Sequence, residues 1–292
     1  MPLLIFVTAL WAFSFSLIGV YLAGQVDSYF SVLSRVFLAA LVFLPLLQWR
    51  GLPARSAFAL MGIGAVQLGL MYLFYYQSFL LLSVPEVLLF TIFTPLYLAL
   101  IYDLLTQQLS GWNLLIAAVA VFGAAIIRWD HLSGEFWRGF CVVQGANLCF
   151  AFGQVAYRRF AQTHPRLPVR QTFGWFYLGA LLVATGAWWG LGTPNYPHTV
   201  EQWAVLLWLG IVASGLGYFL WNKGATQVSA ATLAAMNNAL VPAGLLVNLL
   251  LWNRETDLTR LFVGGVVIVA AVVVSGRYNR GRTRTAAAGL PD

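Results

Sequence analysis

Long apolar runs separated by short polar stretches dominate the pattern along the chain. Most runs are about 20 residues long, the length that an α-helix needs to cross a lipid bilayer. Strands of a membrane barrel would be about ten residues long and would alternate apolar with polar positions. We therefore expect an all-α membrane protein with ten transmembrane helices. The expected ranges are 3–23, 29–48, 57–79, 84–105, 111–128, 138–158, 171–191, 202–222, 229–251 and 260–276.

The composition supports this fold class. Of 292 residues, 61% are hydrophobic and 9% are charged, compared with about 25% charged in a typical soluble domain. The polar stretches between runs are too short for a soluble receptor or catalytic domain. The two cysteines lie in one apolar run and the three histidines are scattered, so we expect no disulfide framework, metal site or cofactor. No GxxxxGK[ST] phosphate loop is present, which argues against ATP hydrolysis.

The basic residues predict the orientation, because Lys and Arg concentrate in cytoplasmic loops. With both termini in the cytoplasm, 11 of the 16 basic residues lie inside and 4 lie outside. Four of them are in the tail after the last apolar run, so the formal charge of +7 suits lipid headgroups and does not require nucleic acid. We expect both termini to be cytoplasmic, in a bacterial inner membrane. The predicted inside set is Arg50, Arg55, Arg158, Arg159, Arg166, Arg170, Lys223, Arg277, Arg280, Arg282 and Arg284.

The second half of the chain repeats the first. "TIFTPLYLAL" (91–100) aligns with "NALVPAGLLV" (238–247), with Pro95 over Pro242, and "NLLIAAVAVFGAAII" (113–127) aligns at the same offset with "RLFVGGVVIVAAVVV" (260–274). We predict a five-helix unit over 1–128, a second over 138–276 and a basic cytoplasmic tail over 277–292. Because five is odd, the second unit enters the membrane inverted, and inverted repeats are typical of transporters.

Two further motifs carry a family resemblance that covers essentially the whole chain. They are "ALWAFSFSLIG" (9–19) and "LGYFLWNKGATQVSAATLAAMNNALVP" (216–242). With the paired units, they make the chain resemble the EamA-type branch of the drug/metabolite transporter superfamily. The resemblance implies ten helices, cytoplasmic termini and passage of small organic solutes. "VPEVLLFTIFTPLYLALIYDLL" (84–105) also resembles a subgroup for uptake of carboxylates, amino acids, amines or a biotin-like vitamin.

Two charged residues fall inside the expected helices, Arg35 in the second and Glu86 at the start of the fourth. A charge at the bilayer centre costs roughly 2.5–3.5 kcal/mol on insertion scales, so each is a candidate for a functional role. The planar guanidinium of Arg35 suits a substrate carboxylate, while Glu86 suits an amine, a ureido group or a coupling proton. Two structural roles stay open: an ion pair between these residues, and an Arg35 that reaches the lipid headgroups.

Pro95 and Pro242 are predicted hinges. Each removes a backbone hydrogen-bond donor, and helix breaks at matching positions of two halves point to a central solute site. A mere kink is the alternative. Aromatic and polar side chains within the spans would line that site, which suits a small, partly apolar solute. These further candidates are Trp11, Phe15, Tyr76, Gln77, Phe90, Thr94, Tyr97, Gln144, Asn147, Tyr218, Asn222 and Asn238.

The function predicted from these features is alternating-access transport of a small metabolite, such as a carboxylate, amino acid, amine or vitamin. Export of amino acids or toxic amphiphiles is the alternative. A multispanning enzyme on lipid-linked substrates is more distant, because it needs clustered acids, histidines or a nucleophile beside a base, and the sequence has no such cluster. A scaffold would give no reason for Arg35 and Glu86 in the membrane.

Overall fold

The computed structural model describes residues 2–47, 52–105, 134–165, 167, 169–228 and 230–252, and positions 119, 259, 262–263, 266–267 and 270. All regular structure in these ranges is helical, which confirms the all-α class. The predicted spans 111–128 and 260–276 lie outside the described residues except at isolated positions, and the tail lies wholly outside them. The number of ten helices and the cytoplasmic termini therefore stay predictions.

The described helices follow the predicted spans closely. In chain order they are α1 (Pro2–Leu17), η1 (Ile18–Leu22), α2 (Ser28–Phe43), η2 (Leu44–Leu46), α3 (Ala54–Gly64), η3 (Ala65–Leu70), α4 (Met71–Ser78), α5 (Val84–Phe90), η4 (Thr91–Phe93), α6 (Thr94–Leu105), α8 (Gly134–Thr163), α9 (Val169–Leu191), α10 (Val200–Leu207), η6 (Trp208–Leu216), α11 (Gly217–Ala225) and α12 (Ala230–Trp252). Six helices in the described part are long and apolar enough to cross a membrane.

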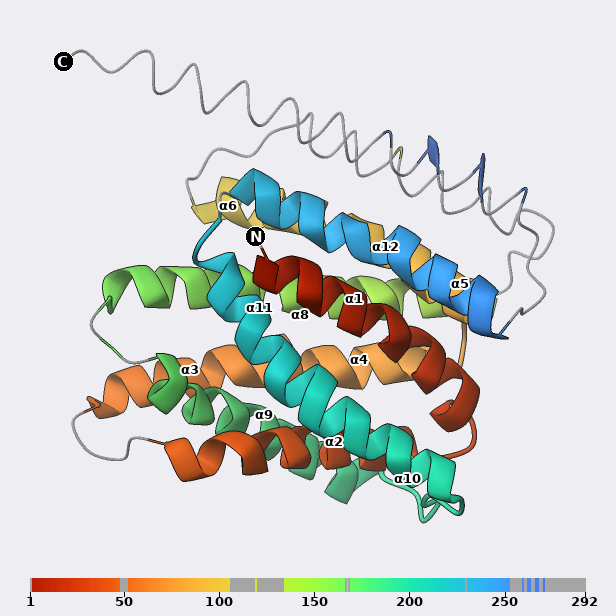
Figure 1. The fold of residues 1–292 in the computed structure, drawn as a ribbon, viewed down its shortest axis with the longest axis horizontal. Coiled ribbons are helices and arrows are strands. Elements are labelled where there is room, and N and C mark those ends of the chain that lie inside the picture. The colour runs from red at the N-terminus through yellow and green to blue at the C-terminus, as the bar shows by residue number, and fades with distance from the viewer. Residues whose placement is uncertain are drawn as a thin grey trace.

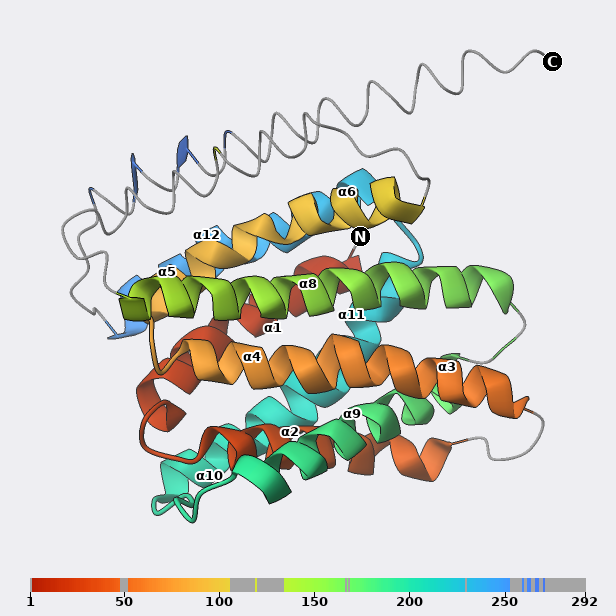
Figure 2. The ribbon, with the colours of Figure 1, turned by 180° about the vertical axis from the view of Figure 1, so that it is seen from behind.

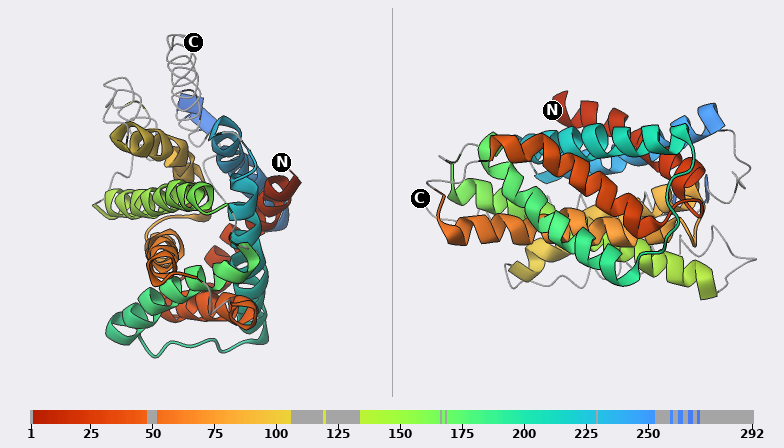
Figure 3. Two further views of the ribbon diagram at one scale, coloured as in Figure 1. Left: turned by 90° about the vertical axis from the view of Figure 1, so that its left-hand side faces the viewer. Right: turned by 90° about the horizontal axis from the view of Figure 1, so that it is seen from below.

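The helices form two rows that meet at α2 and α9 (Figures 1 and 2). Seen end-on, α4, α6 and α8 stack in one row, and α1, α11 and α12 form the other (Figure 3, left). Within the rows, α8 contacts both α4 and α6, while α1 contacts both α11 and α12. Helices α2 and α9 cross each other; α2 packs on η6, and α9 packs on α3 and η3. The core is thus built from segments far apart in the sequence.

Three irregular segments interrupt these helices. The fourth predicted span breaks at η4, a 3-10 turn that ends directly before Thr94 and Pro95. Proline has no backbone N–H, so a break on its N-terminal side is expected. The segments η3 and η6 are π-helical, a geometry frequent at functional sites. Helix α12, by contrast, runs through Pro242 without a break, so the structure has a break beside one of the two predicted hinges.

Glycine allows α3 and α9 to approach closely. A methyl group added to Gly64 would overlap the carbonyl oxygen of Phe176, and one added to Gly179 would overlap that of Met61. The two contacts are reciprocal, since each glycine faces the backbone of the other helix. Small residues at helix contacts let two backbones pack directly in a membrane. This contact fixes α9 against the helix that leads into η3.

Candidate functional site

Arg35 on α2 is the centre of a buried polar site. Its side chain is 2% exposed. The Nε atom donates a hydrogen bond to Ser214 Oγ at 3.0 Å, Nη1 donates to Tyr76 Oη at 3.2 Å, and Nη2 donates to Tyr72 Oη at 2.8 Å. A fourth hydrogen bond of 2.8 Å joins the Tyr72 and Ser214 hydroxyls. The predicted burial of a charge at Arg35 is therefore present, and its hydrogen-bond partners come from two segments, α4 and η6.

The partners of this guanidinium are neutral. Its carbon lies 4.2 Å from the centre of the Tyr72 ring and 5.6 Å from that of Tyr76, both within cation–π range. Within the described residues, its hydrogen bonds go only to hydroxyl groups. A guanidinium has five N–H donors, and three of them are used here, which leaves two. The site can therefore accept an anion, and a carboxylate matches the fork geometry of arginine.

The π-helical segment η6 presents Ser214 to Arg35. A π turn leaves backbone carbonyls without their usual α-helical partners. The Tyr177 hydroxyl contacts the carbonyl oxygens of Ser214 at 2.8 Å and Gly215 at 2.6 Å. The indole Nε1 of Trp11 donates to the carbonyl oxygen of Ala213 at 2.9 Å. Side chains from α9 and α1 thus fix the segment that carries Ser214.

An aromatic cluster adjoins the arginine site. The ring centres of Trp11 and Tyr218 are 5.0 Å apart, as are those of Trp11 and Trp221. Tyr218 also lies 5.7 Å from Tyr72, edge to face. On the other side, Phe15 packs edge to face on Tyr75 at 5.3 Å. The predicted residues Trp11 and Tyr218 are thus brought together, and Tyr218 joins them to the tyrosines around Arg35.

Glu86 has a different environment from Arg35. Its Oε2 atom accepts hydrogen bonds from the Ser83 backbone N at 2.8 Å and from Ser83 Oγ at 2.7 Å. This is a capping box, in which a glutamate at the third helical position satisfies the start of its own helix. The hydrogen bonds of Arg35 do not include this carboxylate. The structure therefore gives the two predicted charges separate partners.

The four predicted residues around the helix break form one network. Asn147 on α8 donates to the carbonyl oxygen of Phe90 at 2.8 Å and to Gln144 Oε1 at 3.1 Å. Its Oδ1 accepts a hydrogen bond of 3.4 Å from Thr94. Since η4 frees carbonyls in this region, Asn147 supplies a donor where the helix ladder is interrupted. The Gln144 Nε2 atom is buried without a partner among the described residues.

The remaining candidates are dispersed. Gln77 donates to Ser28 Oγ at 2.7 Å, and Tyr97 packs beside Leu98, Ile101, Ala151 and Val155. Asn222 is fully buried and accepts a hydrogen bond of 3.2 Å from Gln67. The Oδ1 atom of Asn238 is buried without a described partner, whereas Pro242 is exposed on its helix. Their roles in solute binding stay predictions.

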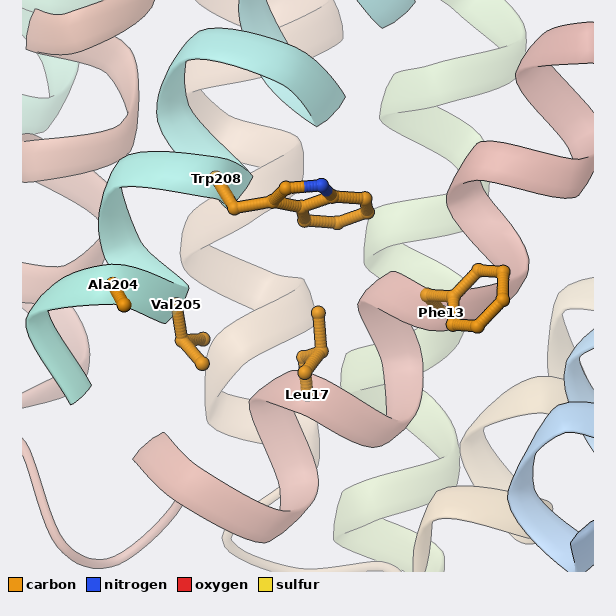
Figure 4. Close-up of a pocket in the computed structure, with 5 residues that line it drawn as sticks. All are labelled: Phe13, Leu17, Ala204, Val205 and Trp208. Carbon is orange, nitrogen blue, oxygen red and sulfur yellow. The ribbon is translucent and has the colours of Figure 1, made fainter. Parts of the chain in front are cut away.

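A separate apolar groove lies on the flank between α1 and α10–η6 (Figure 4). Its volume is about 520 Å³. Its five lining residues are apolar, and the residues of the arginine site are not among them. The groove therefore does not serve as the polar solute site. It is lined by Phe13, Leu17, Ala204, Val205 and Trp208.

Sequence reasoning missed Ser214 and Gln67 as site residues. Ser214 stands in a run of small residues, and Gln67 stands between Val66 and Leu68 in an apolar span. A polar residue inside a membrane span is a signal for a partner within the bundle, and by that signal both could have been chosen. Their positions on the π-helical segments η3 and η6 could not be predicted from a hydrophobic pattern. Among the described residues, no cluster of His, Cys, Asp or Glu could hold a metal ion.

Long apolar helices that enclose a buried arginine indicate an integral membrane protein, and the comparisons with known proteins place it in the solute transporter class. The model of the EamA-like transporter family matches residues 137–277. A Pseudomonas aeruginosa protein named "Probable biotin transporter" is 57% identical over 277 residues, covering 94% of this chain and 97% of that protein. The chain belongs to the EamA-like transporter family, and it is a transporter and not an enzyme.

Other relatives agree with this family. Proteins named "Biotin transporter" from Salmonella typhimurium and Escherichia coli strain K12 are each 51% identical over 280 residues, covering 95% of this chain and 93% of the relative. A solved crystal structure aligns with a TM-score of 0.67 and 18% identity, over 94% of this chain and 95% of that one. At that identity the likeness concerns the fold alone.

Proposed function

We propose that this chain takes up biotin, or a closely related carboxylate, across the bacterial inner membrane, and that Arg35 binds the carboxylate. The names of three relatives, at 51% and 57% identity over almost the whole chain, support biotin as the solute. Biotin carries a carboxylate on a flexible chain and a cyclic ureido group on an apolar ring system. A site for it needs a cation, apolar ring surfaces and amide-type hydrogen-bonding groups.

The observation that carries the proposal is the neutral environment of Arg35. Removing an ion from water costs several kcal/mol, and neutral hydrogen bonds offset only part of that cost. A solute carboxylate offsets more of it, because it adds an opposite charge in a medium of low dielectric constant. The two unused N–H donors of Arg35 supply the contacts. The aromatic rings of Trp11 and Tyr218 offer apolar surface next to the bound carboxylate.

The arrangement of helices supports alternating access by two inverted units. Helix α1 contacts α11 and α12 in one row, as α8 contacts α4 and α6 in the other. The alignment of Pro95 with Pro242 gives an offset of 242 − 95 = 147 residues, which carries η3 (65–70) onto 212–217, within or beside η6 (208–216). Equivalent contacts and π-helical segments in both halves are what two inverted units would produce. The same proposal places both termini in the cytoplasm.

The test is counterflow of labelled biotin in proteoliposomes. The wild-type chain is expected to exchange external labelled biotin for internal unlabelled biotin with saturation. Arg35→Gln should lose at least about 10-fold in kcat/KM, since a charged hydrogen bond is worth about 1.5–3 kcal/mol, and Arg35→Lys should also lose activity because it cannot form a fork. Arg55→Gln, which changes an exposed arginine, is the matched control.

The direction of transport needs a cellular test. An importer restores growth of a biotin auxotroph at low external biotin, whereas an exporter raises tolerance to its solute and restores no growth. Absence of biotin counterflow by the wild-type chain would overturn the proposal. Unchanged counterflow in Arg35→Gln would overturn the assignment of the carboxylate to this residue.

A further inference from the structure

We infer that a second solute subsite, selective for a cyclic amide or ureide, lies among buried amides at the contact of η3, α8 and α11. This inference rests on the proposed uptake of biotin and deepens it. The subsite comprises Gln67, Gln154, Trp221 and Asn222, with Asn237 beside them, and is called the amide cluster below. All five are at least nine-tenths buried, and they come from both halves of the chain.

Hydrogen bonds hold the amide cluster together but do not use all of its polar atoms. Gln67 Nε2 donates to Asn222 Oδ1 at 3.2 Å. Gln154 Oε1 accepts from Trp221 Nε1 at 3.4 Å and from Asn237 Nδ2 at 3.3 Å. Gln67 Oε1 and Gln154 Nε2 have no hydrogen-bond partner among the described residues. Buried polar groups without partners are rare and unfavourable.

The two unpartnered atoms specify the ligand chemistry. One is a carbonyl oxygen that accepts, and the other is an amino group that donates. Gln67 packs directly against Gly153, since a methyl group on that glycine would lie 2.8 Å from Gln67 Cδ, and Gln154 is the next residue. The cluster can therefore receive a group that has an N–H beside a C=O, as a cyclic amide or ureide does. A carboxylate alone offers no donor for Gln67.

The position of the amide cluster relative to Arg35 suits an elongated solute. Ser214, Tyr218 and Asn222 recur at every fourth residue along η6 and α11, so they follow one side of the same helix. Asn222 lies eight positions after Ser214, which corresponds to roughly 12 Å of helix rise. Arg35 contacts the first of these residues, Gln67 contacts the last, and Tyr218 lies between them.

Rings fill the space between the arginine and the amides. The Trp11 ring packs at a tilt against both Tyr218 and Trp221, with ring centres 5.0 Å apart in each pair, and the Phe150 ring lies 6.0 Å from that of Tyr218. The protein thus presents a cation, then aromatic rings, then amides along one line. A solute with a carboxylate at one end, an apolar middle and a ureide at the other end matches this order. Because these side chains pack tightly, the solute reaches them when the helices separate during the transport cycle.

Competition in the counterflow assay tests this subsite. Three competitors of labelled biotin are used: desthiobiotin, which keeps the ureide and the carboxylate; nonanoate, which keeps only the chain and the carboxylate; and biotinamide, which keeps the ureide but is uncharged. The wild-type chain should prefer desthiobiotin to nonanoate by at least about 30-fold, since two hydrogen bonds of about 1 kcal/mol each correspond to that ratio.

The expected variant results separate the two ends of the site. Gln154→Leu and Gln67→Leu each remove one hydrogen bond of about 1 kcal/mol, so each should raise the KM for biotin about 5-fold and reduce the preference for desthiobiotin over nonanoate from about 30-fold to about 5-fold. Arg35→Gln should instead keep the preference for desthiobiotin over nonanoate, called the ring preference below. In this variant, uncharged biotinamide should compete as strongly as unlabelled biotin does. Asn248→Leu is the matched control, because Asn248 is a buried amide on α12 bonded to Ser16 outside the cluster, and it should leave the ring preference unchanged.

The outcomes distinguish failure of the inference from failure of the proposed function. If wild-type biotin counterflow is present and Gln154→Leu retains a wild-type ring preference, the amide cluster is not the ureide site. If wild-type counterflow is absent, both proposals fall. Gln154→Asn, which shortens the amide by one methylene, provides a second variant if Gln154→Leu does not fold. It should weaken desthiobiotin more than nonanoate, and equal weakening of both would overturn the inference.

Discussion

Asp27 and Thr193 fasten the start of α2 to the loop between α9 and α10. The Oδ2 atom of Asp27 accepts hydrogen bonds from the backbone N of Thr193 at 3.1 Å and from its hydroxyl at 2.8 Å. Its Oδ1 atom caps α2 by accepting from the backbone N of Phe30 at 2.7 Å. One buried carboxylate thus stabilises a helix terminus and a contact between two segments far apart in the sequence.

Thr193→Val removes one hydrogen bond of this contact and leaves the helix cap intact. We expect it to lower the free energy of unfolding by about 1 kcal/mol, whereas Asp27→Ala should cost more because it also removes the cap. Thermal unfolding in detergent measures both. Asn195→Ala is the control, since the hydrogen bonds of Asn195 here come from its backbone, with the carbonyl oxygen accepting from Asp27 N at 2.7 Å and the N–H donating to the Thr193 carbonyl oxygen at 2.8 Å. Equal melting temperatures for Thr193→Val and wild type would contradict this account.

The contact between α3 and α9 predicts a contrast between glycines of the same helices. Gly64→Ala and Gly179→Ala place a methyl group against backbone, so the helices must move apart, and both variants should lose folded protein in detergent. Nothing lies within 4 Å of a methyl group on Gly62 or Gly186. Gly62→Ala and Gly186→Ala should therefore be neutral or stabilise by up to about 1 kcal/mol through helix propensity.

Size-exclusion profiles after heating distinguish these four variants. The two buried glycines are each matched by an exposed glycine on the same helix, so expression and detergent effects cancel in the comparison. A Gly64→Ala protein as heat-stable as Gly62→Ala would show that α3 and α9 do not depend on backbone contact.

Tyr72→Phe tests the partners of Arg35. The variant keeps the ring beneath the guanidinium but removes hydrogen bonds to Nη2 and to Ser214 Oγ. Because Tyr72 orients the guanidinium, we expect the KM for the carboxylate to rise about 10-fold, equivalent to 1.4 kcal/mol, with a smaller change in kcat. Initial rates of counterflow over a range of biotin concentrations give both constants. Tyr157→Phe is the control, since Tyr157 is equally buried and packs on Phe173. An unchanged KM in Tyr72→Phe would contradict the orienting role.

Glu86 offers a test of helix capping against solute or proton binding. Glutamine can also complete a capping box, so Glu86→Gln should fold and transport normally if capping is the role of this residue. Glu86→Ala should then lower the free energy of unfolding by about 1 kcal/mol, as loss of a cap does. A role in proton coupling or amine binding predicts the opposite pattern, with a stable Glu86→Gln protein that loses transport. Measuring melting temperature and counterflow in both variants separates these roles.

The helical spans were predictable because burial in lipid forces continuous apolar runs of a set length. The break at 91–93 was predictable from Pro95, because proline lacks the backbone N–H that would continue the helix. Arg35 could be selected because a charge within such a run is rare. Its partners could not, because Tyr72 and Ser214 are 37 and 179 residues away from it in sequence, and only the packing of α2 on α4 and η6 brings them together.

Glu86 and Pro242 show why the remaining positions were harder to predict. Glu86 stands three residues after Ser83 and directly after Pro85, a pattern typical of a helix start. A glutamate at this position is therefore compatible both with helix capping and with solute binding, and the sequence alone does not distinguish these roles. Pro242 aligns with Pro95, yet α12 continues through it. Sequence symmetry between two units thus does not require the same backbone at both positions.

The neutral partners of Arg35 have an electrical consequence. Arginine stays protonated, so the empty site holds one positive charge, and a carboxylate bound to Arg35 as proposed would leave the loaded site with none. The membrane potential therefore acts mainly on the return of the empty carrier, with about 2.3 kcal/mol per elementary charge for each 100 mV. A potential that is negative inside the cell slows that return during net uptake and leaves exchange of one solute for another almost unaffected. Under the proposed uptake of an anion, accumulation against this potential would require a cation to enter with each anion.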